Sequence, residues 1–504
     1  MSTNRHQRVL RGMAALLIVA LLLPGGFSTA QAPEDGDFTR FEPALRDEFT
    51  SDMDAHSDAP RYTIDLTIAL DEAAATITGS QQVRYTNRTP HTLNRIVFRL
   101  YPNLPSFGGQ MTVSRIMVDG RAAPAQLDPT GTVLSIPLPQ PLARGESTTL
   151  ALDYEIRVVA EQTRLYNQFS YIDGVLSLPN AYPVLSVYEP RSGWWSVTDH
   201  SQGDAVYSET GFYEVTLTAP DDLTVITSGT EIASDEGANG AVTRTIVAPL
   251  MRDFAIFAGP RYVSHSAEVD GVTVTIFYDP ARPNAETNAN AGLRATVEAV
   301  RLFNSLFGPY PYAKLDVVQT PTTAGGIEYP GVFVVGYDAW DQISDRFLFV
   351  VVHETAHQWW YSLVGNDQTL DPWMDEALAQ FAVALFIGAL EGDGSYGAAM
   401  NSFLLQHDRF VSLGEGLDFP IGLPVSEYEG MSYFYTVYQK GPLFFGALVD
   451  TYGGEAALGA LSDYFDAYRY RIAEPADMLH SFEQSLDADL DDFFEEWVGE
   501  FAVG

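Results

Sequence analysis

The feature that most constrains this chain is the five-residue sequence His353-Glu354-Thr355-Ala356-His357, which lies within an apolar stretch. Residues four apart lie on the same face of a helix, so His353 and His357 can direct two imidazoles at one metal ion. Glu354 follows His353 one step round the helix and can reach a water molecule at that metal. The stretch therefore predicts a helix that carries part of a metal site.

A carboxylate at ligand-like spacing completes the predicted site. Glu376 follows His357 by nineteen positions and lies in a second predicted helix. Two nitrogen ligands and one oxygen ligand leave the fourth tetrahedral position open, which is typical of a catalytic zinc rather than a structural one. The positions where a third histidine ligand would follow are Trp360 and Leu363, which excludes the three-histidine pattern. We therefore expect one Zn²⁺ per chain.

Composition excludes several other kinds of function. The 504 residues include 66 acidic and only 28 basic residues, so the formal net charge is -38. Nucleic-acid binding is not expected, because few cations are available to neutralise phosphates. The chain has no cysteine, which excludes disulfides and thiolate chemistry.

The N-terminus has the features of an export signal. Three arginines precede an apolar run, Met13 to Leu23, and Ala30-Gln31-Ala32 offers a cleavage site between small residues. The run is too short to span a bilayer comfortably. Residues 1–32 therefore predict export to the periplasm, the cell surface or the medium. Membrane contact is expected only if the segment stays uncleaved, and no later stretch reads as a membrane span.

Hydrophobic periodicity divides the rest of the chain into three parts. Residues 33–60 are polar and acidic and predict a flexible leader. Residues 61–264 contain alternating strands such as Tyr62 to Ile68, separated by turn residues, and predict an all-β domain with sheets packed face to face. A long Pro- and aromatic-rich stretch, 166–200, interrupts them; we expect it either to pack against the neighbouring domain or to line the substrate cleft.

Residues 265–504 predict a mixed domain that becomes mostly helical. Pro330 places part of the strand at 325–335 on a sheet edge. Asp341 or Ser344 is expected to cap the helix that carries the two histidines, and Gly365 to end it. The predicted strands are 272–278, 315–319 and 325–335, and the predicted helices are 285–307, 344–364, 375–391, 396–409, 435–452, 455–468 and 490–501.

These motifs together resemble the gluzincin zinc aminopeptidase family, which includes aminopeptidase N and leukotriene hydrolase. The resemblance rests on the histidine motif, the eighteen residues after it, and Glu376 within Trp373-Met374-Asp375-Glu376-Ala377. Gly325-Gly326-Ile327-Glu328-Tyr329 is similar to the family's Gly-x-Met-Glu-Asn motif, and Tyr438-Gln439-Lys440-Gly441 to its Tyr-x-Lys-Gly motif. Ile327 and Tyr329 depart from the family pattern, as do Asp375 and Ala377.

The resemblance implies an α+β fold. An N-terminal all-β sandwich or saddle domain would be followed by a thermolysin-like mixed catalytic domain with a largely helical C-terminal lobe. Full-length relatives continue into a further helical domain. The chain would be a short form without that domain, which implies a more open cleft.

The resemblance also implies a role for each candidate site residue. His353, His357 and Glu376 would bind zinc, and Glu354 would act as the general base. Tyr438 would donate a hydrogen bond to the oxyanion. Glu328, with Gly325 and Gly326 beside it, would bind the free N-terminus of a peptide substrate.

The implied function is an exported zinc metallopeptidase that hydrolyses N-terminal peptide bonds. Two alternatives stay open. One is a thermolysin-like endopeptidase, to which the departures around Glu328 give some support. The other is a non-catalytic scaffold of the same fold that binds partners through its acidic β surface.

Overall fold

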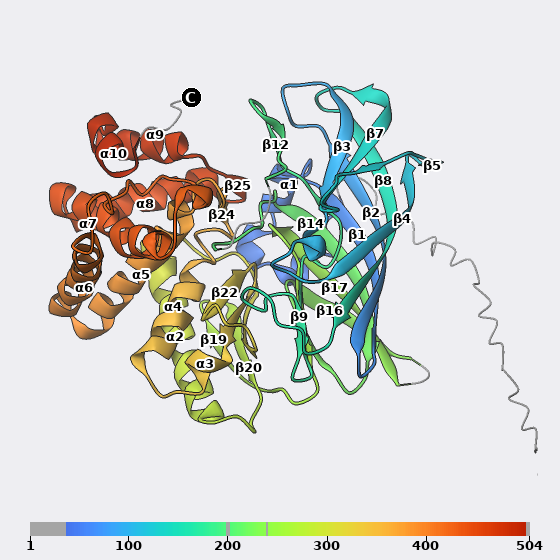
Figure 1. Cartoon of the computed structure of the whole chain (residues 1–504), viewed down its shortest axis with the longest axis horizontal. Coiled ribbons are helices and arrows are strands. Elements are labelled where there is room, and N and C mark those ends of the chain that lie inside the picture. Colours follow the sequence, from blue (N-terminus) through green and yellow to red (C-terminus); the bar gives the residue numbers. More distant parts are fainter. Residues whose placement is uncertain (1–36, 198–201, 238–239, 500–504) are drawn as a thin grey trace, which may run out of the picture. The chain divides into compact units, whose positions relative to one another are not determined.

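The computed structural model describes residues 37–197, 202–237 and 240–499 (Figure 1). The predicted export signal at 1–32 lies outside these residues.

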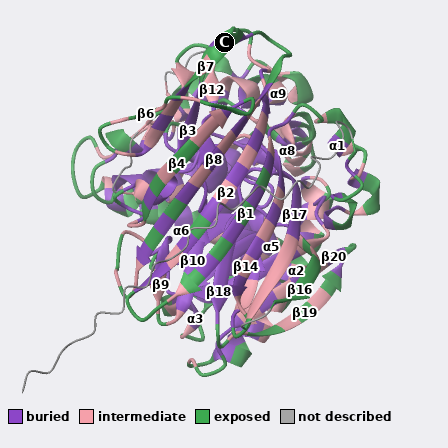
Figure 2. Cartoon of the chain, turned by 90° about the vertical axis from the view of Figure 1, so that its right-hand side faces the viewer, coloured by how far each residue is buried: buried purple, intermediate pink, exposed green. Residues whose placement is uncertain are grey.

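An eight-stranded sheet dominates the N-terminal part. β1 pairs with β14 in parallel, and the other neighbours in this sheet are antiparallel. Along β1, buried side chains alternate with exposed ones, so one face covers a core and the other meets solvent (Figure 2). The strands, in spatial order, are β16 (Thr230–Glu236), β17 (Ala241–Met251), β14 (Gly211–Pro220), β1 (Arg61–Leu70), β2 (Ala74–Thr86), β8 (Ser147–Val159), β4 (Gln110–Val118) and β5 (Arg121–Ala122).

Smaller sheets cover the buried face of this large sheet. The backbone N–H of Leu185 on β11 donates to the hydroxyl of Tyr62 on β1 at 3.1 Å, and Gln81 Nε2 on β2 donates to Pro183 O at 2.9 Å. The prediction of sheets packed face to face is confirmed. One sheet contains β15 (Thr224–Thr227), β18 (Ala255–Gly259), β10 (Val175–Pro179) and β9 (Ser170–Ile172); the second contains β11 (Val184–Leu185), β3 (Leu93–Arg99), β7 (Val133–Leu142) and β6 (Gln126–Leu127); β12 (Tyr188–Glu189) and β13 (Gly193–Trp194) form a ribbon.

A five-stranded sheet begins the mixed C-terminal part of the chain. Its first strand starts at Val263 rather than at 265. Three central strands run parallel, and helix α2 connects the first two of them. The order is β19 (Val263–Val269), β20 (Val272–Tyr278), β21 (Lys314–Thr320), β23 (Val332–Gly336) and β22 (Gly326–Tyr329).

The single strand predicted over 325–335 is wrong: it is a hairpin that turns at Pro330 and Gly331, where Gly331 adopts a positive φ of 74°. Its first strand, β22, lies at the sheet edge.

Helices form the rest of this part, as predicted, and gather on one side of Figure 1. Helix α9 and the π-helical start of the helix at 435–452 were not predicted. The α-helices are α1 (Asp52–Ala55), α2 (Ala285–Leu306), α3 (Tyr337–Trp340), α4 (Asp345–Ala356), α5 (Trp373–Glu391), α6 (Asp393–Val411), α7 (Gly441–Tyr452), α8 (Gly454–Tyr468), α9 (Pro475–Leu486) and α10 (Asp491–Trp497). The 3₁₀ helices are η1 (Glu42–Ala44), η2 (Asp47–Phe49), η3 (Tyr101–Asn103) and η4 (Val425–Glu427), η5 (Phe434–Lys440) is a π-helix, and β24 (Val364–Gly365) pairs with β25 (Arg471–Ile472).

The predicted flexible leader, 33–60, is wrong for its described residues. Phe38, Phe41, Leu45 and Met53 are buried in the core. Apolar residues spaced through a polar segment anchor it to the folded chain, because burying them removes apolar surface from water.

The helix that carries the histidine motif is shorter than predicted. It runs over Asp345–Ala356, with Ser344 as its N-cap residue, and His357 is its C-cap. The chain then turns through Tyr361, whose φ is 107°. The apolar pattern continues past His357 because Trp359 and Trp360 also pack in the core, from the turn and not from a helix.

The buried side chain of Arg252 ties the β part to this turn. Its guanidinium donates to Tyr361 O at 2.7 Å, Leu363 O at 3.3 Å, Ser208 O at 2.9 Å and Arg471 O at 2.8 Å. These carbonyls come from separate stretches of the chain. The arginine thereby replaces helical hydrogen bonds that the turn after α4 does not make.

The aromatic stretch at 166–200 provides another tie. Trp195 Nε1 donates to Asp367 Oδ2 at 2.7 Å, within a buried environment. Tyr166, at the start of the stretch, lines the main cavity of the protein. The stretch therefore both packs against the neighbouring part and borders the cleft.

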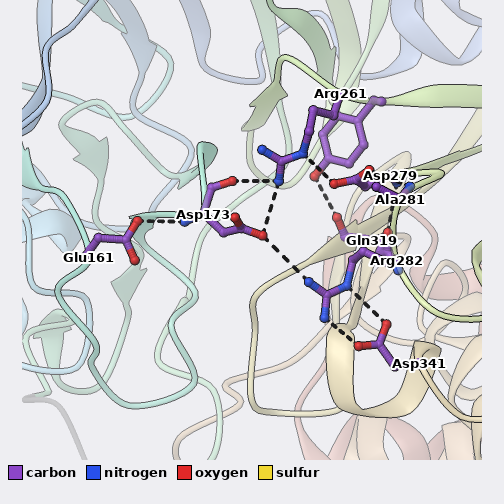
Figure 3. Close-up of polar contacts among 9 residues, drawn as sticks. Glu161, Asp173, Arg261, Asp279, Ala281, Arg282, Gln319 and Asp341 are labelled. Carbon is purple, nitrogen blue, oxygen red and sulfur yellow. Dashed lines mark hydrogen bonds and ion pairs between the residues drawn. The ribbon is translucent and has the colours of Figure 1, made fainter.

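A charged network joins the two parts at the opposite end of α4 (Figure 3). Arg261 donates to Asp173 O at 2.9 Å and pairs with Asp279 at 2.5 Å. Arg282 lies 3.7 Å from Asp173 and pairs with Asp341 at 2.5 Å. Asp173 belongs to the β part, so the network links the β9–β10 turn to the segment that leads into α4.

Among the described residues, one helix has the length and composition of a membrane span. It is α5, with a mean hydropathy of 1.4, and 72% of it is buried inside the protein. That burial is typical of a core helix.

Candidate metal centre and active site

Helix α4 places both histidines of the motif on its buried face. His353 Nε2 lies 3.1 Å from His357 Nε2, and both side chains are almost fully buried. Two ring nitrogens rarely approach one another in a core without a shared partner. The four-residue spacing therefore produces the convergence that the sequence predicted.

Glu376 reaches the same point from the first turn of α5. Its Oε2 lies 3.1 Å from His353 Nε2 and 3.4 Å from His357 Nε2. Ligands about 2.0–2.1 Å from a tetrahedral zinc would lie about 3.3 Å apart, so the three atoms have the spacing of a zinc ligand set. The residues present fit a zinc ion.

The end of α4 orients His357. Its Nδ1 lies 3.0 Å from Trp360 O, which can only accept a hydrogen bond. Nδ1 therefore carries the proton, and the Nε2 lone pair is left for a metal. This contact depends on the turn that follows His357. If α4 continued as a helix, the carbonyl of Trp360 would point along the helix axis and away from the imidazole of His357.

Charges in the site shift the pKa values of the ligands in opposite directions. Burial raises the pKa of Glu376, but its contacts with the imidazoles of His353 and His357 outweigh that effect, and the pKa lies below its usual value. Burial alone would lower the pKa of His357, but the carboxylates of Glu328 and Glu376 raise it well above its usual value. The surrounding negative charge favours a bound cation.

Glu354 lies between the ligands and strand β22. A Cβ at position 326 would lie 2.3 Å from Glu354 Oε1, so Gly326 leaves the space that this side chain occupies. Burial raises the pKa of Glu354 well above its usual value, and the charge of Glu328 adds to the effect. Its Oε2 is buried without a hydrogen-bond partner among the described residues. A carboxylate in this state is suited to accept a proton.

The three residues predicted to bind substrate lie on or beside the edge strand. Gly325 has a positive φ of 106°, and its carbonyl accepts a hydrogen bond from Gly336 N at 2.7 Å. Glu328 is buried, and burial raises its pKa to about 7 against the opposing effect of His357. A ligand atom of Glu328 lies within 4.8 Å of those of Glu354 and His357. The specificity residue and the metal motif therefore share one site.

A hydrogen-bonded chain supports Glu328 and the start of α5. Gln368 Nε2 donates to Glu328 Oε1 and to Asp375 Oδ2, each at 2.8 Å. Asp375 Oδ1 accepts from Asn366 Nδ2 at 3.1 Å and from Glu376 N at 3.0 Å. Asp375, which departs from the family pattern, thus connects Glu328 to the helix that carries Glu376.

Tyr438 projects from the π-helix η5. Its hydroxyl donates a hydrogen bond to Glu376 Oε1, and its ring lies 6.1 Å from that of His353. Burial raises its pKa well above the usual value, so the phenol stays protonated. The extra residue per turn of a π-helix is often found at functional sites, and here it belongs to the turn that presents Tyr438. Of two tyrosines close to it in sequence, Tyr433 also lines the cavity and Tyr435 does not.

These side chains line a cavity of about 930 Å³. The sequence did not identify two carboxylates that line it: Asp345 at the start of α4, and Asp204, from the β part, which lies in the same cavity as Glu328. Burial raises the pKa of Asp204 well above its usual value, and the charges of Glu328 and Glu376 contribute. Asp204 lies in a loop between strands with no motif around it, so no local signal could have identified it.

Comparisons with known proteins agree on one family. Residues 292–497 match the peptidase family M1 domain. The chain is 24% identical over 335 residues to aminopeptidase M1-B of rice, Oryza sativa, which is 62% of this chain and 38% of that protein. It is 25% identical over 262 residues to aminopeptidase N of Streptomyces lividans, which is 48% of this chain and 30% of that protein. The matched part is thus about a third of the length of these relatives.

Solved structures extend the similarity to the whole fold. The crystal structure of an M1 zinc metallopeptidase from Deinococcus radiodurans superposes with a TM-score of 0.66 at 21% identity. The superposition covers 89% of this chain and 94% of that one. A mutant of that protein bound to a Tyr-Ser-Ala substrate gives a TM-score of 0.67. The β part and the catalytic part therefore occur together in a protein of similar fold.

Proposed function

We propose that the chain, whose residues 292–497 match the peptidase family M1 domain, is a zinc aminopeptidase of that family and hydrolyses the N-terminal peptide bond of peptides. The observation that carries the proposal is the convergence of two histidines and a glutamate beside a buried glutamate on an edge strand. Relatives named aminopeptidase and zinc metallopeptidase support it.

Substrate binding would begin at the edge strand β22. An extended peptide can add to a free sheet edge through backbone hydrogen bonds. Glu328 and Asp204 would face its terminal ammonium. Burial raises both pKa values, and the charge of Glu376 adds to both, so an ammonium beside these carboxylates would offset the cost of their charges.

His353, His357 and Glu376 would hold the metal. When bound there, zinc supplies Lewis acidity and lowers the pKa of a water molecule to about 7. Glu354 accepts the proton of the attacking water at its carboxylate and delivers it to the nitrogen of the leaving amine. Its raised pKa helps it to hold that proton between the two steps.

Tyr438 would stabilise the oxyanion that forms on the former carbonyl oxygen. Its protonated hydroxyl now donates to Glu376 Oε1 and would change partner when substrate binds. Tyr438→Phe should lower kcat by about 100- to 1000-fold with little change in KM, because the donor acts on charge that develops in the transition state.

The deciding experiment compares free and N-acetylated peptides of one sequence. An aminopeptidase should cleave the free peptide at its first bond and leave the acetylated one intact. Glu328→Gln should raise KM for the free peptide more than it lowers kcat. Equal cleavage of both peptides, or cleavage at internal bonds, would instead support the endopeptidase alternative.

We also propose export through residues 1–32, on the basis of the basic start, the apolar run and the small-residue cleavage site. The full chain expressed in a bacterium with a secretory pathway should yield a mature protein beginning near residue 33 outside the cytoplasm. An intact N-terminus on protein recovered from the cytoplasm would contradict export.

A further inference from the structure

The charges that line the catalytic cavity are unequally distributed. Arg346 is the only lysine or arginine among its lining residues. The guanidinium has no ion pair or hydrogen bond with any residue that the structure describes, although Asp345 borders the same part of the cavity. Arg346 is exposed at the edge of the cavity, where it is the one cationic side chain facing several carboxylates in a chain with a net charge of -38.

The arginine and the proposed ammonium site lie on opposite sides of the metal ligands. Helix α4 and strand β22 run in the same direction. A Cβ at Gly325 would lie 3.9 Å from Val350, whereas Gln358 Nε2 donates to Tyr329 O at 3.1 Å. Glu328 therefore lies toward the His357 end of α4. Arg346 lies one turn before Val350, toward the other end.

We propose that Arg346 binds the C-terminal carboxylate of a short peptide, which makes this chain selective for peptides of three or four residues with both termini free. The inference rests on the proposed aminopeptidase function, because it needs an ammonium at Glu328. A zwitterionic peptide then matches the cavity at both ends, with its positive end at the carboxylates and its negative end at the arginine.

The dimensions of the cavity support this length. Arg346 precedes His353 by seven residues, which is about 10.5 Å along a helix. An extended peptide advances about 3.3–3.4 Å per residue, so about 10 Å separates a carbonyl at the metal from a carboxylate three residues later. That is the span of a tetrapeptide, and the flexible arginine side chain can also reach toward the carboxylate of a tripeptide.

The lining between the two ends is apolar. Phe349 and Val350 of α4 and Phe403 of α6 border the cavity there. Arg346 is itself exposed to solvent, so its pairing with a carboxylate is partly screened, and the apolar wall contributes by contacting the peptide between its two ends. We therefore expect the charge of the substrate's C-terminus to affect KM.

The test measures kcat/KM for peptides of two to six residues that have an N-terminal leucine followed by glycines. Each peptide is assayed as the free acid and as the C-terminal amide. For peptides of three and four residues, the kcat/KM of the zinc-loaded full chain should be about tenfold higher for the acid than for the amide. The difference should become smaller for peptides of two and of six residues. Arg346→Gln should reduce the acid-to-amide ratio to about one, mainly through KM. Arg346→Lys should retain part of it. Rates are expressed relative to hydrolysis of leucyl-p-nitroanilide, which has no carboxylate.

Arg294→Gln serves as the matched control, since this arginine is exposed on α2 outside the cavity. Its acid-to-amide ratio should equal that of the unmodified chain. A preference that persists in Arg346→Gln, or equal rates for acids and amides in the unmodified chain, would overturn the role of Arg346 alone. Failure to cleave leucyl-p-nitroanilide and every peptide would instead reject the proposed function.

A binding measurement separates recognition from turnover. In a Glu354→Gln background, calorimetry with leucyl-glycyl-glycine should give a Kd about tenfold higher when Arg346→Gln is added. An unchanged Kd would count against the proposal.

Discussion

At the scale of single residues, Glu354 has the chemical role that is most directly testable. Glu354→Gln keeps the size of the side chain and removes its ability to accept a proton. Zinc content should stay near one per chain, because His353, His357 and Glu376 are intact, while kcat should fall by at least about 100-fold. Metal analysis beside a peptide assay checks both parts. Loss of zinc would show that Glu354 is itself a ligand, and retained activity would contradict its role as base.

Asp253 provides a prediction about pH. Burial raises its pKa to about 7, against hydrogen bonding from Tyr361 and the charge of Arg252. The folded state then binds a proton that the unfolded state releases near pH 4, so folding stability should fall as pH rises from about 4 to about 7. The slope from one such group is at most about 1.4 kcal/mol per pH unit.

The variant Asp253→Asn should remove this contribution and flatten the decrease in stability between pH 4 and 7. Thermal melts across that range, compared with the exposed control Asp222→Asn, measure it. An unaltered pH dependence in Asp253→Asn would mean that the buried carboxyl is not protonated in the folded state.

The roles of single residues could be predicted from the sequence where those residues lie a few positions apart on one helix. The two histidines and Glu354 lie within one helical turn and a half, so the geometry of a helix determines how they meet. Asp204 and Gln368 had no such signal. Their roles depend on which distant segments border the same cavity.

At the scale of elements, the end of α4 is the clearest difference from the sequence-based prediction. The spacing of the apolar residues Trp359, Trp360 and Leu363 is compatible with a continued helix. It is equally compatible with a turn whose side chains are buried. What ends the helix is the buried Arg252, which binds the carbonyls of Tyr361 and Leu363. Periodicity alone carries no information about such a distant partner.

The pair Gly365→Ala and Gly459→Ala tests this explanation. A Cβ at Gly365 would lie 2.1 Å from the Arg252 guanidinium carbon, so the substitution should destabilise the protein by several kcal/mol. Gly459 is exposed within α8 with open space around its Cβ position, and alanine there should stabilise by about 0.5–1 kcal/mol. Chemical denaturation measures both. A neutral Gly365→Ala would indicate that the arginine can move without cost.

The hairpin at 325–335 is a different case, because its signal is local. Its turn residues, Pro330 and Gly331, predict a turn, but Pro330 also suits a strand at a sheet edge. The helix predicted at 435–452 was correct in extent, but hydrophobic spacing does not distinguish a π-helical start from an α-helical one.

At the scale of the whole molecule, metal binding should affect stability as well as activity. The cavity gathers the carboxylates of Asp204, Glu328, Glu354 and Glu376, and a divalent cation reduces their mutual repulsion. A chelator should abolish peptide hydrolysis and lower Tm by several degrees while far-UV circular dichroism stays unchanged, because the cores lie elsewhere. Added zinc should restore both. An unchanged Tm after verified metal loss would contradict this coupling.

The two parts of the chain are joined closely enough to build one site. Trp195 binds Asp367 directly, Arg252 binds the turn after α4, and the network around Asp173 joins the segment before α4. These contacts fix both ends of the metal-ligand helix against the β part. The position of Asp204 in the cavity follows from that arrangement.

By itself, the sequence determined the metal chemistry and the fold class, because a four-residue spacing on a helix and a two-residue alternation on a strand are local geometry. Only the tertiary structure decided where α4 ends and that Asp204 and Gln368 lie in the same site as Glu328. The physical reason is that these outcomes depend on packing between segments that lie far apart in the sequence, which local spacing does not encode.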